Sequence, residues 1–372
     1  MAFLWISSYN FFPHRKSATF AAMITEISID SFYTQHHRLP MIDVRSPGEF
    51  EKGHITGATN IPLFSNEERA HVGTVYVQQS KEKAVELGYR YVNPKLDRFI
   101  AESRKVAPKS AVAVHCWRGG MRSHAFAEHL HQNGFQEVYV ITGGYKAFRN
   151  HVLSFFEQPF RLRILGGYTG SGKTFVLKQL KKLGQQVIDL EGIAHHKGSA
   201  FGSIGEMEQP TVEQFENSLF EQFRQLNLQN PIWLEDESHN IGHVKIPMPL
   251  FRQIRQQVVY FIQIPKEQRA RHLVNEYAPF GNDRLAWAIN GIAKRLGGQN
   301  VQRAHELLRE NNFYEVALLA LQYYDKAYTR GVEDRNPELV FRIPLADMNH
   351  LKNAQSIIKF VEKHEQHQTH TI

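Results

Sequence analysis

Short apolar segments alternate with longer amphipathic segments over the first part of the chain. Residues 41–45, 111–114 and 137–141 are short and rich in β-branched side chains, which predicts buried strands. Residues 97–106 and 146–156 place apolar side chains three and four positions apart, which predicts helices. Strands that alternate with helices are typical of a parallel sheet. The region that begins near Ile24 is therefore predicted to be an α/β domain.

The same alternation starts again after residue 160. Residues 161–165, 186–188 and 231–234 are predicted strands, and residues 175–183 form a predicted helix with an apolar face and a lysine-rich face. From Lys266 onward the pattern becomes helical and basic. We expect a parallel-sheet domain over 24–157, a linker at Gln158 and Pro159, and a second α/β domain over 160–372 with a helical C-terminal part. Residues 1–23 are predicted to be a disordered tail or an extension before Met23.

Composition limits the function in three ways. The 372 residues are enough for about two domains, and the single cysteine excludes an internal disulfide, a Cys-rich zinc site and an internal resolving thiol. One cysteine and no apolar run of about 18 residues predict a cytoplasmic protein with no membrane partner. The net charge of +7 suits a polyanion such as nucleic acid, although a charge of this size also serves plain solubility.

The cysteine lies in the segment Cys116, Trp117, Arg118, Gly119, Gly120, Met121 and Arg122. This segment follows a predicted strand and precedes a predicted helix that opens on Ser123 as its cap. Backbone N–H groups at such a turn, the helix dipole and two arginines all favour the thiolate, which is the nucleophilic form of cysteine. The alternative is a buried structural cysteine. Two glycines and two arginines beside it argue against this alternative, because they are poorly suited to a hydrophobic core. We therefore predict a reactive Cys116.

A second motif opens the second domain. Residues 167–174 match G-x-x-x-x-G-K-T between a predicted strand and a predicted helix. Such a loop cradles two linked phosphates on backbone N–H groups, while Lys173 reaches the outer phosphate and Thr174 can bind Mg²⁺. The predicted phosphate-binding residues are Gly167, Gly170, Ser171, Gly172, Lys173 and Thr174.

Acidic and basic side chains follow later strands. Glu235 and Asp236 directly follow the predicted strand 231–234 and are candidates to hold Mg²⁺ or water. The alternative is a solvated acidic loop. Cations interleaved with aromatic rings fit contacts to phosphates and unpaired bases of RNA, although an amphipathic helical bundle shows the same pattern. Adjacent histidines rarely face one ion, so no metal site is assigned with them. The candidate RNA contacts are His196, Lys197, Lys294, Arg295, Tyr323 and Tyr324.

The first domain resembles the rhodanese family. The resemblance lies in residues 43–45, 53–58, 116–122 and 143–145, which occur in the family's order and spacing. It implies a cysteine that carries sulfur or selenium as a persulfide or perselenide, held by the surrounding amides and arginines.

The order of the two domains is more specific than either domain alone. The chain from about Ile24 to Val361 resembles the tRNA 2-selenouridine synthase family, on residues 116–123, 141–149, 167–174, 189–192 with 196–199, 235–238 and 323–325. The resemblance implies that selenium from selenophosphate replaces the sulfur of wobble 2-thiouridine, through an S-geranyl intermediate made from geranyl diphosphate. It implies as partners a tRNA with a 2-thiouridine derivative at the wobble position and an enzyme that produces selenophosphate. The phosphate loop would then hold the diphosphate, and Cys116 would handle selenium.

Two other classes stay open at this point. One is a rhodanese-type sulfurtransferase fused to a P-loop kinase or NTPase that acts on small molecules. The other is a non-catalytic RNA-binding module, which would have no need for a thiolate flanked by arginines. The sequence leaves open whether ATP or GTP is bound and where a prenyl chain would lie.

Overall fold

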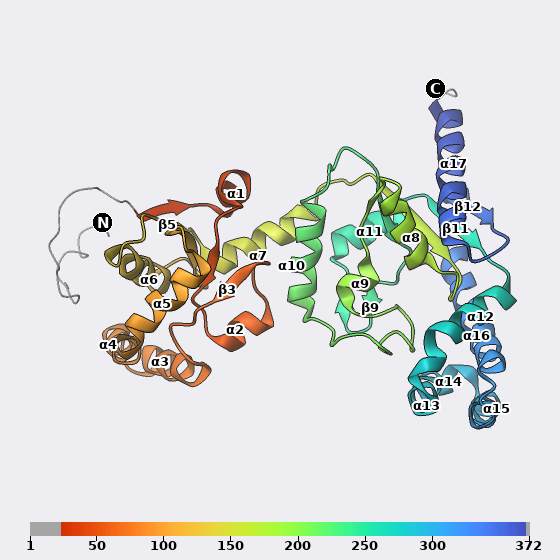
Figure 1. Ribbon diagram of the computed structural model, residues 1–372, viewed down its shortest axis with the longest axis horizontal. Helices are drawn as coiled ribbons and strands as arrows, with labels where there is room; N and C mark the ends of the chain where they lie inside the picture. Colours follow the sequence, from red (N-terminus) through yellow and green to blue (C-terminus); the bar gives the residue numbers. More distant parts are fainter. Residues whose placement is uncertain (1–23, 370–372) are drawn as a thin grey trace. The chain divides into compact units, whose positions relative to one another are not determined.

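The computed structural model describes residues 24–369, which divide into two compact units (Figure 1). The first unit contains residues 24–47 and 57–145, and the second contains residues 48–56 and the described residues from 146 onward. The predicted tail, residues 1–23, lies outside the described residues. Helix α7 (Gly144–Phe155) belongs to the second unit for most of its length, although the sequence pattern assigned it to the first domain.

In the first unit, the described strands form a five-stranded parallel sheet in the order β1-β5-β4-β2-β3. The strand bounds are β1 Ile24–Ile27, β2 Met41–Asp43, β3 Ala58–Asn60, β4 Ala111–His115 and β5 Glu137–Ile141. Strand β4 is the middle strand of the sheet. Its residues Val112, Ala113 and Val114 are fully buried, so both of its faces are covered. The segment after β4 therefore leaves the middle of the sheet at its carboxyl edge, where ligands of such sheets bind.

Helices pack against this sheet, and Phe99, Phe126 and Leu130 fill the core between helices and strands. The helix bounds are α1 Ile29–Ser31, α2 Pro47–Lys52, α3 Asn66–Gln78, α4 Lys81–Val92, α5 Leu96–Val106 and α6 Met121–Gln132, with a π-helix at Phe32–His36 and a 3₁₀ turn at Asn93–Lys95. The predicted cap at Ser123 is wrong, because α6 begins at Met121 with Gly120 as its N-cap. Ser123 lies inside the first turn, where its hydroxyl donates to the Gly120 carbonyl at 3.0 Å.

In the second unit, the described strands form another five-stranded parallel sheet, in the order β12-β11-β6-β8-β7. The strand bounds are β6 Leu162–Gly167, β7 Gln186–Val187, β8 Ile232–Glu235, β11 Val259–Gln263 and β12 Val340–Pro344, with an antiparallel pair β9 Asn240–Ile241 and β10 Val244–Lys245. The central position of β6 brings the glycine-rich loop after it to the middle of the carboxyl edge. The α/β class predicted for both domains is confirmed.

The helices of the second unit form two groups. Helices α8 and α17 pack with the sheet around Leu177, Leu180 and Ile357, whereas the helices of the C-terminal part build a separate core around Ile289 and Leu308. The bounds are α8 Lys173–Lys182, α9 Leu190–Ala194, α10 Val212–Phe223, α11 Met248–Gln256, α12 Lys266–Tyr277, α13 Asn282–Gly291, α14 Ala293–Leu296, α15 Gly298–Arg309, α16 Phe313–Glu333 and α17 His350–Thr369, with 3₁₀ turns at Ala278–Phe280 and Pro337–Leu339. The predicted helical C-terminal part is thus confirmed.

Two candidate active sites

Cys116 lies directly after β4 and is almost completely buried, with 3% of its surface exposed. Its carbonyl accepts a hydrogen bond from the Tyr145 N–H at 2.9 Å, which ties the cysteine loop to the start of α7. The ring of Trp117 lies over Tyr145, with 5.7 Å between the centroids. The loop is therefore held at both ends by elements that the sheet positions.

Two glycines allow this loop to pack against the backbone of β5 and α7. Gly119 has φ +60°, and a Cβ there would lie 2.3 Å from the Ile141 carbonyl oxygen. Gly144 has φ +57°, and a Cβ there would lie 2.3 Å from the Cys116 carbonyl oxygen and 2.4 Å from the Gly119 nitrogen. Both positions combine left-handed backbone with contact to other backbone atoms, so only glycine fits either one. In contrast, a Cβ on Gly120 would meet nothing within 4 Å.

The surroundings of Cys116 favour the thiolate. Burial alone would raise the pKa of the thiol, but a hydrogen bond from Ser123, the charge of Arg122 and the N–H groups of Arg118 and Ser123 outweigh it, so the pKa lies below the usual thiol value. The Ser123 Oγ lies 3.4 Å from the Cys116 Sγ. Its single proton also serves the Gly120 carbonyl, so the thiolate gains this hydrogen bond only when the hydroxyl turns toward sulfur.

A buried ion pair supports the loop from below. Arg45 and Asp43 are both fully buried, and their closest side-chain nitrogen and oxygen atoms lie 2.6 Å apart. The Arg45 guanidinium also stacks on the Tyr145 ring at 3.7 Å. Burial would raise the pKa of Asp43, but the His115 and Arg45 charges and hydrogen bonds from Arg45 lower it below its usual value. The sequence placed both residues in the predicted strand 41–45 and in the rhodanese resemblance, but nothing in it indicated that they form a buried pair.

The second site lies around the glycine-rich loop after β6. Gly170 and Gly172 have φ +76° and +72°, and Gly172 is the N-cap of α8. No side chain caps α8, which leaves its first N–H groups to a ligand; anions bind at such helix ends. The Lys173 ammonium donates to the Gly167 carbonyl at 3.1 Å and lies 5.4 Å from the centre of the Tyr328 ring. The Ser171 hydroxyl is buried and has no hydrogen-bond partner among the residues that the structure describes.

Two glutamates face this loop. Glu191 accepts from the Thr174 hydroxyl at 2.7 Å, and it lies beside Glu237, with which it shares a hydrogen bond. Burial raises the pKa of both carboxyl groups, and the neighbouring Glu191 charge helps to raise the pKa of Glu237 to about 8. Lys173 opposes the rise in both cases. The pair therefore holds a proton between its carboxyl groups at neutral pH when no ligand is bound.

The predicted acidic residues have other contacts. Glu235 is fully buried and accepts from the Leu190 N–H at 3.1 Å, whereas the Asp236 carboxylate forms an ion pair with Arg335 and lies 3.9 Å from Arg255. Their assignment to Mg²⁺ stays a prediction. Nothing in the spacing of the acidic run singled out Glu237, and Glu191 appeared only in the family resemblance.

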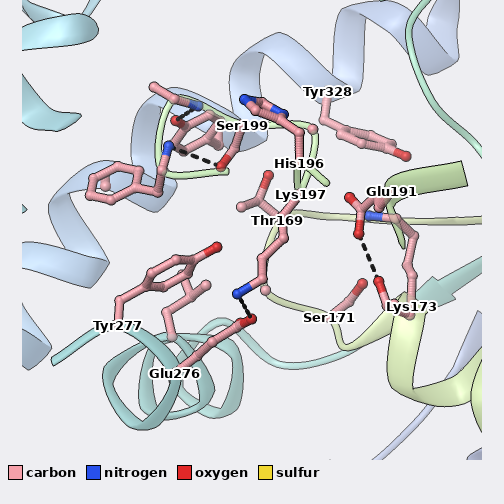
Figure 2. A pocket seen from close by; sticks show the side chains of 18 of the residues that line it. Thr169, Ser171, Lys173, Glu191, His196, Lys197, Ser199, Glu276, Tyr277 and Tyr328 are labelled. Carbon is pink, nitrogen blue, oxygen red and sulfur yellow. Dashed lines mark hydrogen bonds and ion pairs between the residues drawn. The ribbon is translucent and has the colours of Figure 1, made fainter. Parts of the chain in front are cut away.

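The glycine-rich loop opens into a cavity of about 1220 Å³ (Figure 2). Its polar lining includes Lys173, Glu191 and Glu237, and α12 adds His272 and Glu276. Helices α12, α13 and α16 also contribute apolar side chains to the lining. These are Leu273, Val274, Leu285, Phe313, Val316, Ala317 and Ala320. The cavity therefore suits a ligand with a phosphorylated end and an apolar end.

Five of the six predicted tRNA contacts line this cavity, and Lys294 is the one that does not. His196 and Lys197 line it from inside, and the Lys197 ammonium forms ion pairs with Glu276 at 2.9 Å and Glu206 at 3.3 Å (Figure 2). Lys294 and Arg295 are exposed on α14, where Arg295 donates to the Tyr323 hydroxyl at 3.2 Å. The Tyr324 hydroxyl instead accepts from the Ala200 N–H at 3.2 Å. The positive charge of Lys197 is thus compensated by two glutamates. Lys294 and Arg295 are instead exposed at the surface.

No group of three or more His, Cys, Asp or Glu side chains within residues 24–369 could hold a metal ion by itself. A divalent ion in this cavity would need Thr174, Glu191 and oxygen atoms of a bound phosphate, which is how Mg²⁺ is usually held. None of the helices in the described part of the chain is long and apolar enough to cross a membrane.

Comparisons with known proteins agree with this arrangement. Residues 28–151 match the rhodanese-like domain, and residues 160–358 match the tRNA 2-selenouridine synthase AAA domain. The chain is 33% identical to a tRNA 2-selenouridine synthase of Sulfurovum sp. over 360 residues, which covers 87% of this chain and 95% of the relative. It is 31% identical to that of Nitrosomonas europaea over 355 residues, covering 82% and 91%. A solved N-terminal domain from Clostridium difficile 630 is 37% identical over 35% of this chain and 99% of its own length, with a TM-score of 0.33.

Both domain matches lie in the order predicted from the two loops, and the full-length relatives carry one common name. The chain belongs to the tRNA 2-selenouridine synthase family.

Proposed function

We propose that this protein replaces the sulfur of wobble 2-thiouridine in tRNA by selenium from selenophosphate, through an S-geranyl intermediate made from geranyl diphosphate. The observation that carries the proposal is the pairing of an activated thiol with a phosphate-binding cavity that has an apolar wall, in a chain of this family. The relatives' name supports tRNA as the substrate. The donors come from the family resemblance.

The first step belongs to the cavity beside the glycine-rich loop. The diphosphate would lie at the N-terminus of α8 with Lys173, and the geranyl chain would lie along Leu273, Ala317 and Ala320. The C2 sulfur of the tRNA base attacks C1 of the geranyl chain, the C1–O bond breaks, and diphosphate leaves with the electron pair. The N3 proton of the base is released to solvent. Lys173 and the helix N-terminus stabilise the charge on the leaving diphosphate.

The second step belongs to Cys116. Its thiolate attacks C2, the bond from C2 to the geranyl sulfur breaks, and geranylthiol leaves after taking a proton from solvent. The selenium of selenophosphate then displaces the Cys116 thiolate from C2. Water cleaves the selenium–phosphorus bond, so that phosphate leaves and the selenouridine regains its N3 proton. This relay replaces the expected perselenide, since selenium in selenophosphate is already fully reduced and a perselenide would require an added oxidant.

The tRNA needs cationic and aromatic contacts as well. Lys294 and Arg295 are exposed on α14 beside Tyr323, and Trp287 is 64% exposed on the neighbouring α13. Cations bind backbone phosphates and exposed rings stack on unpaired bases, which is how proteins hold single-stranded anticodon loops. We assign the face of α13 and α14 to tRNA.

Mg²⁺, where it takes part, would be held by Thr174 and Glu191 and would neutralise the donor's diphosphate.

The test is nucleoside mass spectrometry of tRNA from cells that lack the gene and carry wild type, Cys116→Ala, Lys173→Ala or Lys182→Ala. Cys116→Ala should abolish selenouridine and allow geranylated thiouridine to accumulate, because only the second step uses the thiolate. Lys173→Ala should abolish both products. Lys182→Ala, an exposed residue at the far end of α8, is the control and should form both. Unchanged selenouridine in the Cys116→Ala cells would contradict the proposal. Turnover of thiosulfate without any effect on tRNA would favour the small-molecule sulfurtransferase.

A further inference from the structure

A second cavity lies in the first unit, and Cys116 is part of its wall. Its volume is about 900 Å³, and helices α3 and α4, the start of α6 and the cysteine loop enclose it. Phe99, Phe126 and the Cys116 side chain lie at its inner end. This volume is in the range of small-ligand sites. The cavity is separate from the glycine-rich loop, because all the residues that line it fall between positions 63 and 129.

The lining of this cavity is almost wholly apolar. Val72, Val85, Val92 and Leu96 contribute aliphatic surface from α3, α4 and α5. Eleven large hydrophobic side chains are exposed in the described part of the chain, and four of them line this one cavity: Tyr76, Val77, Trp117 and Met121. Exposed apolar surface gathered in one place marks a site for an apolar ligand or partner.

Charges at the same cavity indicate what the apolar ligand is attached to. Arg69, Lys81, Arg118 and Arg122 also line it, and no acidic side chain does. A bare selenophosphate would match these cations but leave the apolar wall in water. A free alkyl chain would fill the wall but make no use of the positive charge on this lining. An alkyl chain on a nucleotide satisfies both, since its phosphates face the cations while the chain is buried.

We infer that this cavity binds the alkyl chain of an S-prenylated 2-thiouridine in tRNA and holds its C2 atom at the Cys116 sulfur. The inference rests on the proposed function and adds a second prenyl site, distinct from the one that takes the geranyl donor. The cavity orients the C2–S bond toward the thiolate, and it receives the geranylthiol when that bond breaks.

The experiment compares two substrates that differ only in the alkyl chain. Full-length protein and selenophosphate are given an anticodon stem-loop with either S-geranyl- or S-methyl-2-thiouridine at the wobble position, and selenouridine formation is timed. The variant Tyr76→Ser with Val77→Ser removes one exposed ring and the two exposed methyl groups of a valine, so its folding is not at risk. Leu351→Ser removes an exposed apolar side chain from α17 and is the matched control.

We expect wild type and Leu351→Ser to prefer the geranyl substrate in kcat/KM. The double variant should lose at least about tenfold on that substrate and nothing on the methyl substrate, because only the long chain reaches α3. An unchanged preference in the double variant overturns the inference, and so does an equal loss on both substrates, which would mean that another chain segment or a protein covers this surface. A wild type that converts neither substrate overturns the proposed function itself.

A second readout locates the chain directly. A stem-loop whose S-alkyl chain ends in a diazirine should, on irradiation of the Lys173→Ala protein with selenophosphate left out, label peptides from residues 66–92. The Lys173→Ala change removes the donor site without touching the cavity beside Cys116. Labelling confined to α12, α13 or α16 would overturn the inference.

Discussion

The cysteine loop and the glycine-rich loop have the same architecture and opposite roles. Each follows a central parallel strand, needs a glycine in left-handed conformation and leads into a helix N-terminus that no side chain caps. In the first unit the anion at this position is the protein's own Cys116 sulfur, which receives N–H groups from Arg118 and Ser123. In the second unit no side chain within residues 24–369 caps the helix, and Lys173 lies beside its N-terminus together with the Ser171 hydroxyl, which has no hydrogen-bond partner in that range. One loop stabilises an internal anion, and we propose that the other receives an external one.

The surroundings follow the same division. The cysteine loop opens to a mainly apolar cavity that four cationic side chains also line. The glycine-rich loop opens to a cavity lined by an acidic pair and by side chains of helices α12, α13 and α16. Two similar turns therefore serve different chemistry because of the side chains that meet above them.

The largest expected effect is on stability, and it compares how tightly the two loops are packed. Gly119→Ala would force a Cβ into the backbone of β5, which cannot yield without moving the sheet, so we expect a loss of about 3 kcal/mol or more in stability. Gly170→Ala meets mainly the Leu273 side chain, which can move, and should cost less. Urea unfolding of the full chain checks this order by the midpoint of the first transition. Gly120→Ala is the control at about 1 kcal/mol or less, and equal midpoints for all three would contradict the packing argument.

The second effect concerns which surface holds tRNA. Trp287→Ala and Arg295→Ala should each weaken tRNA binding about tenfold, because a lost stack or phosphate contact is seldom compensated. Fluorescence anisotropy of labelled tRNA at one fixed salt concentration measures it. Arg252→Ala, an exposed arginine on α11, should bind as wild type does. If Arg252→Ala weakens binding as much as Arg295→Ala, the contact is diffuse charge and the face of α13 and α14 has no special role.

A third effect tests whether the first loop stabilises an anion. Arg122→Gln and Ser123→Ala should raise the pKa of Cys116, because each removes an interaction that favours the thiolate. At a given pH below the pKa the thiolate fraction then falls, and alkylation by iodoacetamide should slow several-fold. Cys116 is the only cysteine in the chain, so the rate against pH reports on it alone. Arg98→Gln, on the exposed face of α5, should leave the profile unchanged; a profile equal to wild type in Arg122→Gln would contradict the role given to its charge.

The smallest effect concerns the acidic pair of the second loop. Glu237 has a folded pKa of about 8 against 4.5 for the ordinary carboxyl group, so the stability it contributes is present below pH 4.5 and is lost as pH rises through 8. Glu237→Gln removes this titration. Its melting temperature should therefore gain a few degrees on wild type at pH 9 and match it more closely at pH 5. Glu208→Gln, at an exposed position, is the control. A difference that stays constant between the two pH values would exclude the shared proton.

Local patterns accounted for much of the fold. Apolar runs located β4, β5 and β6 to within one or two residues, because strand formation there depends on side chains that the sheet buries completely. The N-cap of α6 was misplaced by three residues, since serine is a common cap residue but the Ser123 hydroxyl bonds inside the first turn. The pattern predicted helix α7 but not the unit to which it belongs. That depends on contacts to α10, such as the ion pair between Arg149 and Glu216.

The sequence by itself determined the two loops, since cysteine with arginines and glycines, or glycines with lysine and threonine, can serve few purposes at the end of a strand. Only the tertiary structure decided which side chains meet there. Glu191 and Glu237 are 46 positions apart and form a hydrogen-bonded pair because β8 ends, and α9 begins, at the same edge of the sheet. The apolar cavity beside Cys116 likewise exists only where α3 and α4 lie against the loop, because an exposed valine in a helix looks in sequence like any other.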